Sequence, residues 1–337
     1  MDSLTHVALG AALGLAVMSR RTALWKAAAW GSAAATLPDL DTFIDHGDAL
    51  SNMTLHRGDS HALFWLSLLA PVLGWLAWRI NGRQTGHWRW WWLMFWLALI
   101  THPLLDLMTV YGTQLARPFS DHPYGAGSIF IIDPLYTLPL LVGVIVALRS
   151  RSRRGLRWNA AGLVISTAYL GWSFAAQQHV SKLAERAIAV QAIAAERVLV
   201  TPTAFNTVLW RIVVMTPGGY REGFYSLLDS DQRIDFERFD SGDRWYTPLA
   251  HQPSVQRVAW FSHGFYGMSR RGEQILISDL RMGQEPTYTF SFIVARVAGD
   301  VLQPVDVPQL AGSRPAIREG LAWLWRRAGG AREPPPR

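Results

Sequence analysis

The chain has 337 residues, enough for two domains, and half of them are apolar. Its mean hydropathy is nevertheless only +0.10, which indicates an average over a membrane part and a soluble part. The lack of cysteine excludes disulfides and thiolate metal sites, so any metal would be held by His, Asp or Glu. The net charge of +7 does not indicate nucleic-acid binding, because the basic residues fall mainly in short turns between apolar runs.

Six apolar runs fill the first half of the chain. They cover residues 4–18, 23–37, 62–78, 90–107, 131–148 and 159–176. At ~15–18 residues each, they are near the lower limit for crossing a hydrocarbon layer of ~30 Å. Many of the 17 tryptophans stand at the ends of these runs, where an amphipathic ring suits the membrane interface. The pattern predicts an α-helical polytopic membrane domain of about six spans, the first two short or re-entrant, followed by a small antiparallel β domain.

Arginine and lysine are concentrated in the first, third and fifth turns between the runs. Because cytoplasmic loops are enriched in these residues, the alternation predicts that these turns face the cytoplasm. The N-terminus, the loops 38–61 and 107–130, and everything after residue 177 would then face outward. We therefore expect a multi-pass membrane protein with an extracytoplasmic C-terminal domain.

In the second half of the chain, the spacing of the apolar residues changes. An Ala-rich segment with interleaved charge predicts a helical linker, and strand candidates separated by turn residues follow it. These candidates are Thr207–Met215, Tyr220–Leu228, Val255–Ser262, Glu273–Asp279 and Tyr288–Arg296. The expected domains are a membrane-embedded metal-site domain (1–177), the linker (178–200), the β domain (201–312) and a tail (313–337). The tail is expected to be an amphipathic helix over Ala316–Arg327 with a disordered end.

Candidate metal ligands lie at the ends of the apolar runs. His102 and Asp106 are four residues apart, which places them on one face of a helix, and ionisable groups within an apolar run are functional by default. Asp39 and Asp41 would point the same way if their segment is extended, and Asp59 or Ser60 is a candidate cap of the following helix. We expect four remote stretches to converge on one site at the outer membrane face. The predicted ligands are His6, Asp39, Asp41, His56, His61, His102 and Asp106.

Imidazoles and carboxylates without thiolates suit Zn²⁺ first, with Mn²⁺ or Mg²⁺ as alternatives, and the number of candidates allows one or two ions. A bound divalent ion lowers the pKa of water to ~7, which favours hydrolysis of an ester or phosphoester. Asp41 or Asp59 is the candidate general base, and Arg57 is expected to bind a phosphate oxygen or to pair with Asp39, Asp41 or Asp59.

Two other classes of function use the same residues. In a metal-ion transporter they would line a pathway through the bilayer. In a non-catalytic scaffold they would enclose a structural metal. Each residue taken alone also has an ordinary role, since a single histidine at a membrane boundary is usually an interfacial hydrogen-bonding group. The expected partners are the lipid bilayer and a lipid or amphiphilic substrate, and no nucleic acid.

The motifs together resemble a known family. Residues 1 to 150 contain an early His, then Pro-Asp-Leu-Asp, His-Arg-Gly-x-x-His and His-Pro-x-x-Asp, in an order similar to that of bacterial inner-membrane proteins described as metal-dependent hydrolases. That family is also described as LexA-regulated or LexA-binding and was once a domain of unknown function. The resemblance implies the same seven residues as the metal site. The region after residue 200 resembles the C-terminal extension of longer members, and the ligand pattern is similar to that of zinc-dependent phospholipases C.

Overall fold

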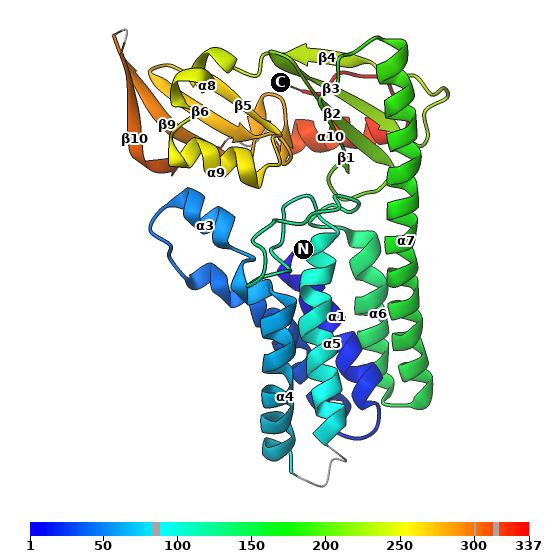
Figure 1. Ribbon diagram of the computed structural model, residues 1–337. Helices are drawn as coiled ribbons and strands as arrows, with labels where there is room; N and C mark the ends of the chain where they lie inside the picture. The colour runs from blue at the N-terminus through cyan, green and yellow to red at the C-terminus, as the bar shows by residue number, and fades with distance from the viewer. Residues whose placement is uncertain (83–87, 300, 313–316, 337) are drawn as a thin grey trace. The chain divides into compact units, whose positions relative to one another are not determined.

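The computed structural model describes residues 1–82, 88–299, 301–312 and 317–336 (Figure 1). The chain divides into two compact units. The first, the helical unit, comprises Met1–Ile44, His56–Phe174 and Ala204–Asn206. The second, the mixed unit, comprises Asp45–Leu55, Ala175–Thr203 and Thr207–Arg337. Residues 313–316 and 337 of the expected tail lie outside the described residues.

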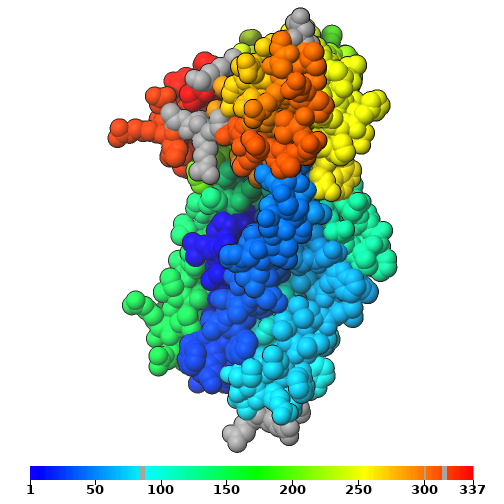
Figure 2. Space-filling model, turned by 90° about the vertical axis from the view of Figure 1, so that its left-hand side faces the viewer, coloured from blue at the N-terminus to red at the C-terminus, as the bar shows by residue number. Residues whose placement is uncertain are grey.

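The helical unit is built from helices that lie side by side in Figure 1. They are α1 (Ser3–Met18), α2 (Leu24–Thr36), α4 (Leu63–Ile80), α5 (Trp88–Leu107), α6 (Pro134–Ser150) and the first part of α7 (Arg153–Val190). Two short 3₁₀ helices, η1 (Pro38–Phe43) and η2 (Asp59–His61), stand in the connections. Figure 2 shows this unit from another side, with the blue N-terminal segment between green and cyan segments.

Small residues hold α1 and α2 together. A Cβ added at Gly10 would lie 2.3 Å from the carbonyl oxygen of Gly31, and one added at Gly14 would lie 2.1 Å from that of Ala27. Glycine at these positions lets the two backbones touch, as small residues do where membrane helices pack closely. The Asp2 carboxylate caps the start of α1 by accepting from the Thr5 amide. The close packing fixes the start of α1 relative to the end of α2, where η1 begins.

The prediction of six membrane spans is wrong. Within the described ranges, α4 is the one helix long and apolar enough to cross a bilayer by length and composition. The apolar helices α1 and α6 have 16 and 17 residues and would reach only ~24–26 Å at 1.5 Å per residue. The longer α5 includes several tryptophans together with Arg89, His102 and Asp106, which lower its hydropathy. The predictions of a multi-pass topology and of an extracytoplasmic C-terminal domain depended on the same six spans, and neither is supported.

The mixed unit contains two four-stranded antiparallel sheets (Figure 1). The first has the order β1-β2-β3-β4, with β1 (Arg197–Pro202), β2 (Leu209–Thr216), β3 (Gly219–Ser226) and β4 (Phe236–Phe239). The second has the order β10-β9-β6-β5, with β5 (Tyr266–Arg271), β6 (Gln274–Asp279), β9 (Ser291–Ala298) and β10 (Val301–Leu310). The short strands β7 (Gly283–Gln284) and β8 (Thr287–Tyr288) form a two-stranded hairpin. The helices that belong wholly to this unit are α3 (Ala49–Leu55), α8 (Asp243–Leu249), α9 (Pro253–Phe261) and α10 (Ile317–Ala328).

The core of the mixed unit includes the end of the long helix α7. Val180, Leu183 and Ile188 of this helix are buried with Trp210 and Ile212 of β2. The helix α3 belongs to the mixed unit although its sequence lies between Asp41 and His56. There the Arg257 guanidinium donates to the hydroxyls of Ser51 at 3.1 Å and Thr54 at 3.4 Å.

The strand predicted over Val255–Ser262 is wrong, because these residues form α9. Pro253 occupies the start of this helix, where its fixed φ and missing N–H suit the first turn. Val255, Val258 and Phe261 are buried at a spacing of three, which is a helical rather than a strand period. In α10, Trp323 and Leu324 are buried within the mixed unit.

Candidate metal centre

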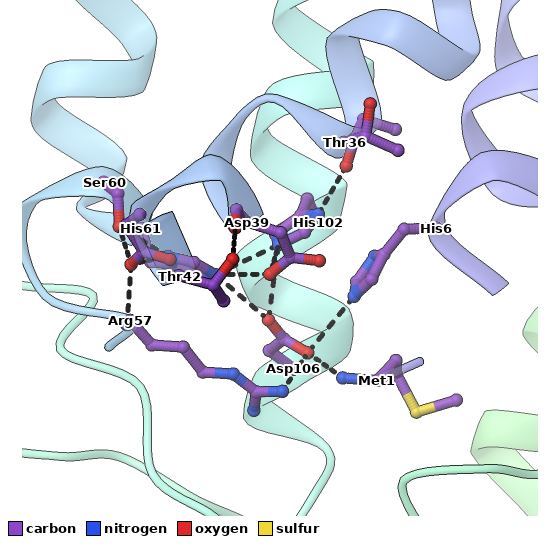
Figure 3. A network of polar contacts seen from close by, with 12 residues as sticks. Met1, His6, Thr36, Asp39, Thr42, Arg57, Ser60, His61, His102 and Asp106 are labelled. Carbon is purple, nitrogen blue, oxygen red and sulfur yellow. Dashed lines mark hydrogen bonds and ion pairs between the residues drawn. The ribbon is translucent and has the colours of Figure 1, made fainter. Parts of the chain in front are cut away.

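Four side chains from three separate elements converge in the helical unit (Figure 3). Asp39 comes from η1, His61 from η2, and His102 and Asp106 from consecutive turns of α5. Each offers one ligand atom, and the four atoms all lie within 4.8 Å of one another. His61, His102 and Asp106 have fully buried side chains, whereas that of Asp39 is 20% exposed. The group is therefore enclosed on most sides and accessible beside Asp39.

Five of the separations among the four ligand atoms are close to the edges of a tetrahedral ion site, while the group as a whole extends to 4.8 Å. The Nε2 atoms of His61 and His102 are 3.0 Å apart. Asp39 Oδ1 lies 3.5 Å from the first and 3.4 Å from the second, and Asp106 Oδ2 lies 3.4 Å from each. Zinc bonds to His and Asp of about 2.0–2.1 Å give tetrahedral edges of about 3.3–3.4 Å. These five separations are therefore close to those of one bound ion.

Hydrogen bonds on the far side of each ring fix which nitrogen carries the proton. His102 Nδ1 lies 2.5 Å from the Ala35 carbonyl oxygen, which can only accept, so Nδ1 carries the hydrogen. The Ser60 hydroxyl donates to Asp41 Oδ2 at 2.6 Å and must then accept from His61 Nδ1 at 2.8 Å. Both Nε2 atoms consequently present lone pairs toward each other. Such an arrangement is repulsive unless a cation or a proton lies between them, and it fits a divalent ion.

The carboxylates of Asp106 and Asp39 also indicate that the site favours a cation. Asp106 Oδ2 is buried with no hydrogen-bond partner in the described part of the chain. Burial raises the pKa of Asp39, but hydrogen bonds from His102 and His61 lower it by more, so this carboxylate stays ionised. Burial also lowers the pKa of His61, yet its contacts with Asp106 and Asp39 raise the pKa above the ordinary value overall. The pocket thus favours positive charge, carried either by a metal ion or by a proton on His61.

The second oxygen of Asp106 faces the Arg57 guanidinium and two further nitrogen groups. Oδ1 lies 3.1 Å from Arg57 Nη2 and 3.3 Å from His6 Nε2, and it also contacts the α-amino group of Met1. The His6 ring stacks on His102 with 3.7 Å between centroids and an angle of 23°. These neighbours neutralise Asp106 and orient its Oδ2 toward the two histidines. A carboxylate that binds a metal is usually held in place by hydrogen bonds of this kind.

Asp41 and His56 lie beside the four ligand atoms. The expectation that Asp39 and Asp41 point the same way is wrong, because η1 has about three residues per turn rather than an extended backbone. Asp41 instead accepts from His56 Nδ1 at 2.8 Å, the Arg57 amide at 3.0 Å and Ser60. Burial raises the pKa of Asp41, but the hydrogen bonds from His56 and Ser60 lower it by more. Asp41 therefore positions His56 directly and His61 through Ser60.

The remaining predicted residues have other surroundings. Arg57 pairs with Asp106 rather than with any of the three expected aspartates, and its guanidinium lies 4.7 Å from the centre of the Tyr111 ring. Asp59 has a side chain that is 63% exposed and pairs with Arg117 at 3.3 Å. Asp59 is thus separate from the group that could hold an ion.

Comparison with known proteins identifies the family of this chain. Residues 1–180, more than half of the chain and all seven predicted ligands, match the model of the YdjM inner membrane protein family. The chain belongs to this family. It is also 27% identical over 255 residues to the Uncharacterized protein YfhP of Bacillus subtilis (strain 168), a match that covers 71% of this chain and 74% of that protein. No solved structure matches the chain.

Membership of the YdjM inner membrane protein family confirms the resemblance drawn from the motifs and associates the chain with the lipid bilayer of the inner membrane. The sequence reasoning missed three groups at the centre, namely the Ser60 hydroxyl as a link, the Ala35 carbonyl and the Met1 amine. Ser60 could have been found, because it stands next to His61 in a motif rich in ligand-type residues. The other two are backbone groups and carry no sequence signal.

Proposed function

We propose that this chain is a membrane-bound metal-dependent hydrolase in which Asp39, His61, His102 and Asp106 hold one divalent ion. The observation that supports it most strongly is the pair of Nε2 lone pairs facing each other at 3.0 Å between two carboxylates. The donor set of two imidazoles and two carboxylates suits zinc first, with manganese or magnesium as alternatives. A bound ion of this kind supplies a water molecule acidified to a pKa of about 7 for attack on an ester or phosphoester.

A single ion suits the site better than two. The outer oxygen of Asp106 already faces Arg57, His6 and the Met1 amine. A second cation beside this oxygen would lie against the Arg57 guanidinium, and like charges at close range repel. We therefore assign one ion to each chain.

The chain's own residues supply the proton transfer. Asp41 holds the Nδ1–H of His56, which leaves the His56 Nε2 with a lone pair able to accept a proton as a general base. The His56 side chain is 21% exposed and can therefore reach a substrate. Asp41 acts through His56 rather than directly, because its own oxygens accept several hydrogen bonds. Asp59 is paired with Arg117 and exposed, so we assign it no part in this step.

Arg57 is the candidate for substrate recognition. Its guanidinium is held by Asp106 and Tyr111, while its Nε is buried with no hydrogen-bond partner among the described residues. A guanidinium binds phosphate oxygens well, and an Nε–H without a partner could donate to one. Because the family belongs to the inner membrane, the substrate class that fits best is a lipid ester or phosphoester whose head group enters beside Asp39.

The test combines metal analysis with turnover. Purified full-length protein should contain about one divalent ion per chain and hydrolyse at least one member of a phospholipid panel. His61→Ala should lose both the ion and the activity, whereas Asp59→Asn should keep both. A bound ion without turnover on any phospholipid would favour a structural metal. Uptake of metal into sealed vesicles that contain the protein would favour transport, and a metal-free wild type would contradict the proposal.

A further inference from the structure

The charged residues of the helical unit are sorted along its helices. Its sequence contains seven aspartates and no glutamate, and all seven lie in the connections or helix ends where α1 starts, α5 ends and α6 begins. The opposite end is where α1 and α6 end and α2 and α7 begin, as Figure 1 shows for α1 and α7. It has no acidic residue but many basic ones, namely Arg20, Arg21, Lys26, Arg149, Arg151, Arg153, Arg154 and Arg157.

Four of these arginines line one cavity. A hollow of about 500 Å³ is bordered by Arg20 and Arg21 from the end of α1 and by Arg153 and Arg157 from the first turns of α7. The two pairs are more than 130 residues apart in sequence, which the numbering gives directly. A general preference for basic loops at a membrane requires only that the arginines be present in the loops. It does not require that they border the same cavity.

The arginines of this cavity lack the partners that the buried cations of the unit have. In the helical unit, as far as it is described, the arginines paired with a carboxylate are Arg57 and Arg117. Arg21 is held in place by donating to the Val17 carbonyl at 3.2 Å and by stacking 3.9 Å above the Trp90 ring. The start of α7 adds the positive end of its helix dipole and has no acid in its first turn. The cavity therefore has concentrated positive charge and fits an anion.

The lining beyond the arginines includes apolar side chains. Arg20 and Leu156 also border a second cavity of about 540 Å³, which is lined by Leu24, Trp25 and Leu148 together with the polar residues Thr22, Arg151 and Ser152. A cationic rim that continues into leucine and tryptophan matches a ligand with a phosphate at one end and hydrocarbon at the other. Free phosphate would use only the first part of such a site.

We propose that this end of the helical unit is a binding site for an anionic phospholipid. Arg20, Arg21, Arg153 and Arg157 contact the phosphate, and Leu156 with Leu148 contacts the start of an acyl chain. Guanidinium groups match phosphate geometry with two parallel hydrogen bonds, and basic pockets in membrane-associated proteins are typical sites for anionic head groups. The site is separate from the metal centre and does not depend on the proposed hydrolysis.

The experiment measures lipid affinity with the full chain in neutral detergent micelles. Wild type and variants are titrated with phosphatidylglycerol or phosphatidylcholine, and binding is followed by tryptophan fluorescence and by native mass spectrometry. We expect wild type to bind phosphatidylglycerol saturably and phosphatidylcholine far more weakly. Arg153→Gln with Arg157→Gln should weaken phosphatidylglycerol binding about 10- to 30-fold, since each basic contact near a membrane surface contributes about one decade or less.

The matched control is Lys182→Gln with Arg186→Gln, which removes the same charge from a later, exposed part of α7. It should bind the lipid as wild type does. Equal loss in both double variants would reveal only general electrostatic attraction and would overturn the site. So would unchanged binding in the Arg153/Arg157 variant, or equal affinity for phosphatidylcholine. Competition by millimolar inorganic phosphate that abolishes lipid binding would replace the lipid with a simple phosphate ligand.

A folding control accompanies these titrations. Circular dichroism and metal content should match wild type in each variant, because the arginines are exposed and far in sequence from the metal ligands. If the glutamine variant does not fold, Arg153→Lys with Arg157→Lys keeps the charge and removes the planar fork. It should still show weaker binding to phosphatidylglycerol, and unchanged binding would contradict bidentate recognition by these arginines.

Discussion

The two ends of the helical unit carry opposite charge and expose it differently. At the metal-centre end, Asp106 is fully buried, and its outer oxygen contacts the Arg57 guanidinium, the His6 ring and the Met1 amine. At the other end, Arg20, Arg153 and Arg157 are exposed, and none has a carboxylate partner in the part of the unit that is described. Buried charge must be compensated within the protein, whereas water can solvate exposed charge.

Because of this difference, a missing partner has a different meaning for an exposed charge than for a buried one. An exposed arginine without a partner costs little and, taken alone, indicates nothing. Asp106 Oδ2, buried without a hydrogen bond and facing two imidazole lone pairs, would be costly unless a cation completes it. The proposed metal centre is supported by this buried oxygen, whereas the proposed lipid site needs the additional evidence of a shared cavity and of apolar residues in the adjoining lining.

The largest effect should come from breaking the buried network. Asp106→Ala removes a metal ligand and leaves Arg57 buried without its carboxylate. Loss of one partner of a buried ion pair costs about 3–5 kcal/mol, so we expect a fall of this size in the free energy of unfolding together with loss of the metal. Chemical denaturation in detergent micelles and metal analysis measure the two effects. The exposed Asp121→Ala serves as the control and should change neither, and a stable, metal-loaded Asp106→Ala would contradict the network.

The next effect concerns the support of His61. Ser60→Ala removes the hydroxyl that accepts from His61 Nδ1 and donates to Asp41. Groups that orient a metal ligand typically contribute 10- to 100-fold to metal affinity, so we expect zinc to bind 10- to 100-fold more weakly. Titration against a competing chelator gives the affinity. Ser120→Ala removes a hydroxyl elsewhere in the unit and should leave zinc affinity unchanged. Equal affinities of wild type and Ser60→Ala would show that the proton on His61 is placed by other means.

The affinity for zinc should also depend on pH. The pKa of His61 is raised above its ordinary value, so a proton occupies this ring at pH values where a free histidine is neutral. Zinc must displace that proton, so its affinity is full above the raised pKa and falls by up to tenfold per unit as the pH drops below it. Asp39 adds no slope there, because its pKa is lowered and it is already ionised. Chelator competition between pH 5.5 and 8.5 measures this, and a flat profile would count against His61 as a ligand.

Parts of the centre could be predicted from local geometry alone. The joint placement of His102 and Asp106 follows from a spacing of four in a helix, and the Nε2–Oδ2 distance of 3.4 Å bears this out. The directions of Asp39 and Asp41 could not be predicted, because they depend on whether the segment after Pro38 is extended or 3₁₀. The pairing of Arg57 with Asp106 joins residues 49 positions apart, and a single sequence contains no signal for such a partner.

The fold was predictable to a different degree. Counting apolar runs overestimated the membrane spans, because α2 has only 13 residues and α5 has polar side chains within its run. Strands β3 and β6 lie where strand candidates were bounded by turn residues, at Gly219–Ser226 and Gln274–Asp279. A short apolar run such as 255–262 fits either a strand or a helix, and there the proline at the helix start was the deciding signal.

The smallest effect on the free energy of unfolding should be found at the basic end of the helical unit. Arg154→Gln removes an exposed arginine that has no carboxylate partner in the described part of the chain, so the free energy of unfolding should stay within about 0.5 kcal/mol of wild type. The change also relieves repulsion from neighbouring arginines at the positive end of the α7 dipole, which slightly favours the folded state. The same substitution at the buried Arg57 should cost several times more, because it deprives Asp106 of a cation. Denaturant titrations of both variants measure the difference. Equal losses would mean that burial does not separate the two ends, and the inference of a metal from the uncompensated Asp106 oxygen would lose its basis.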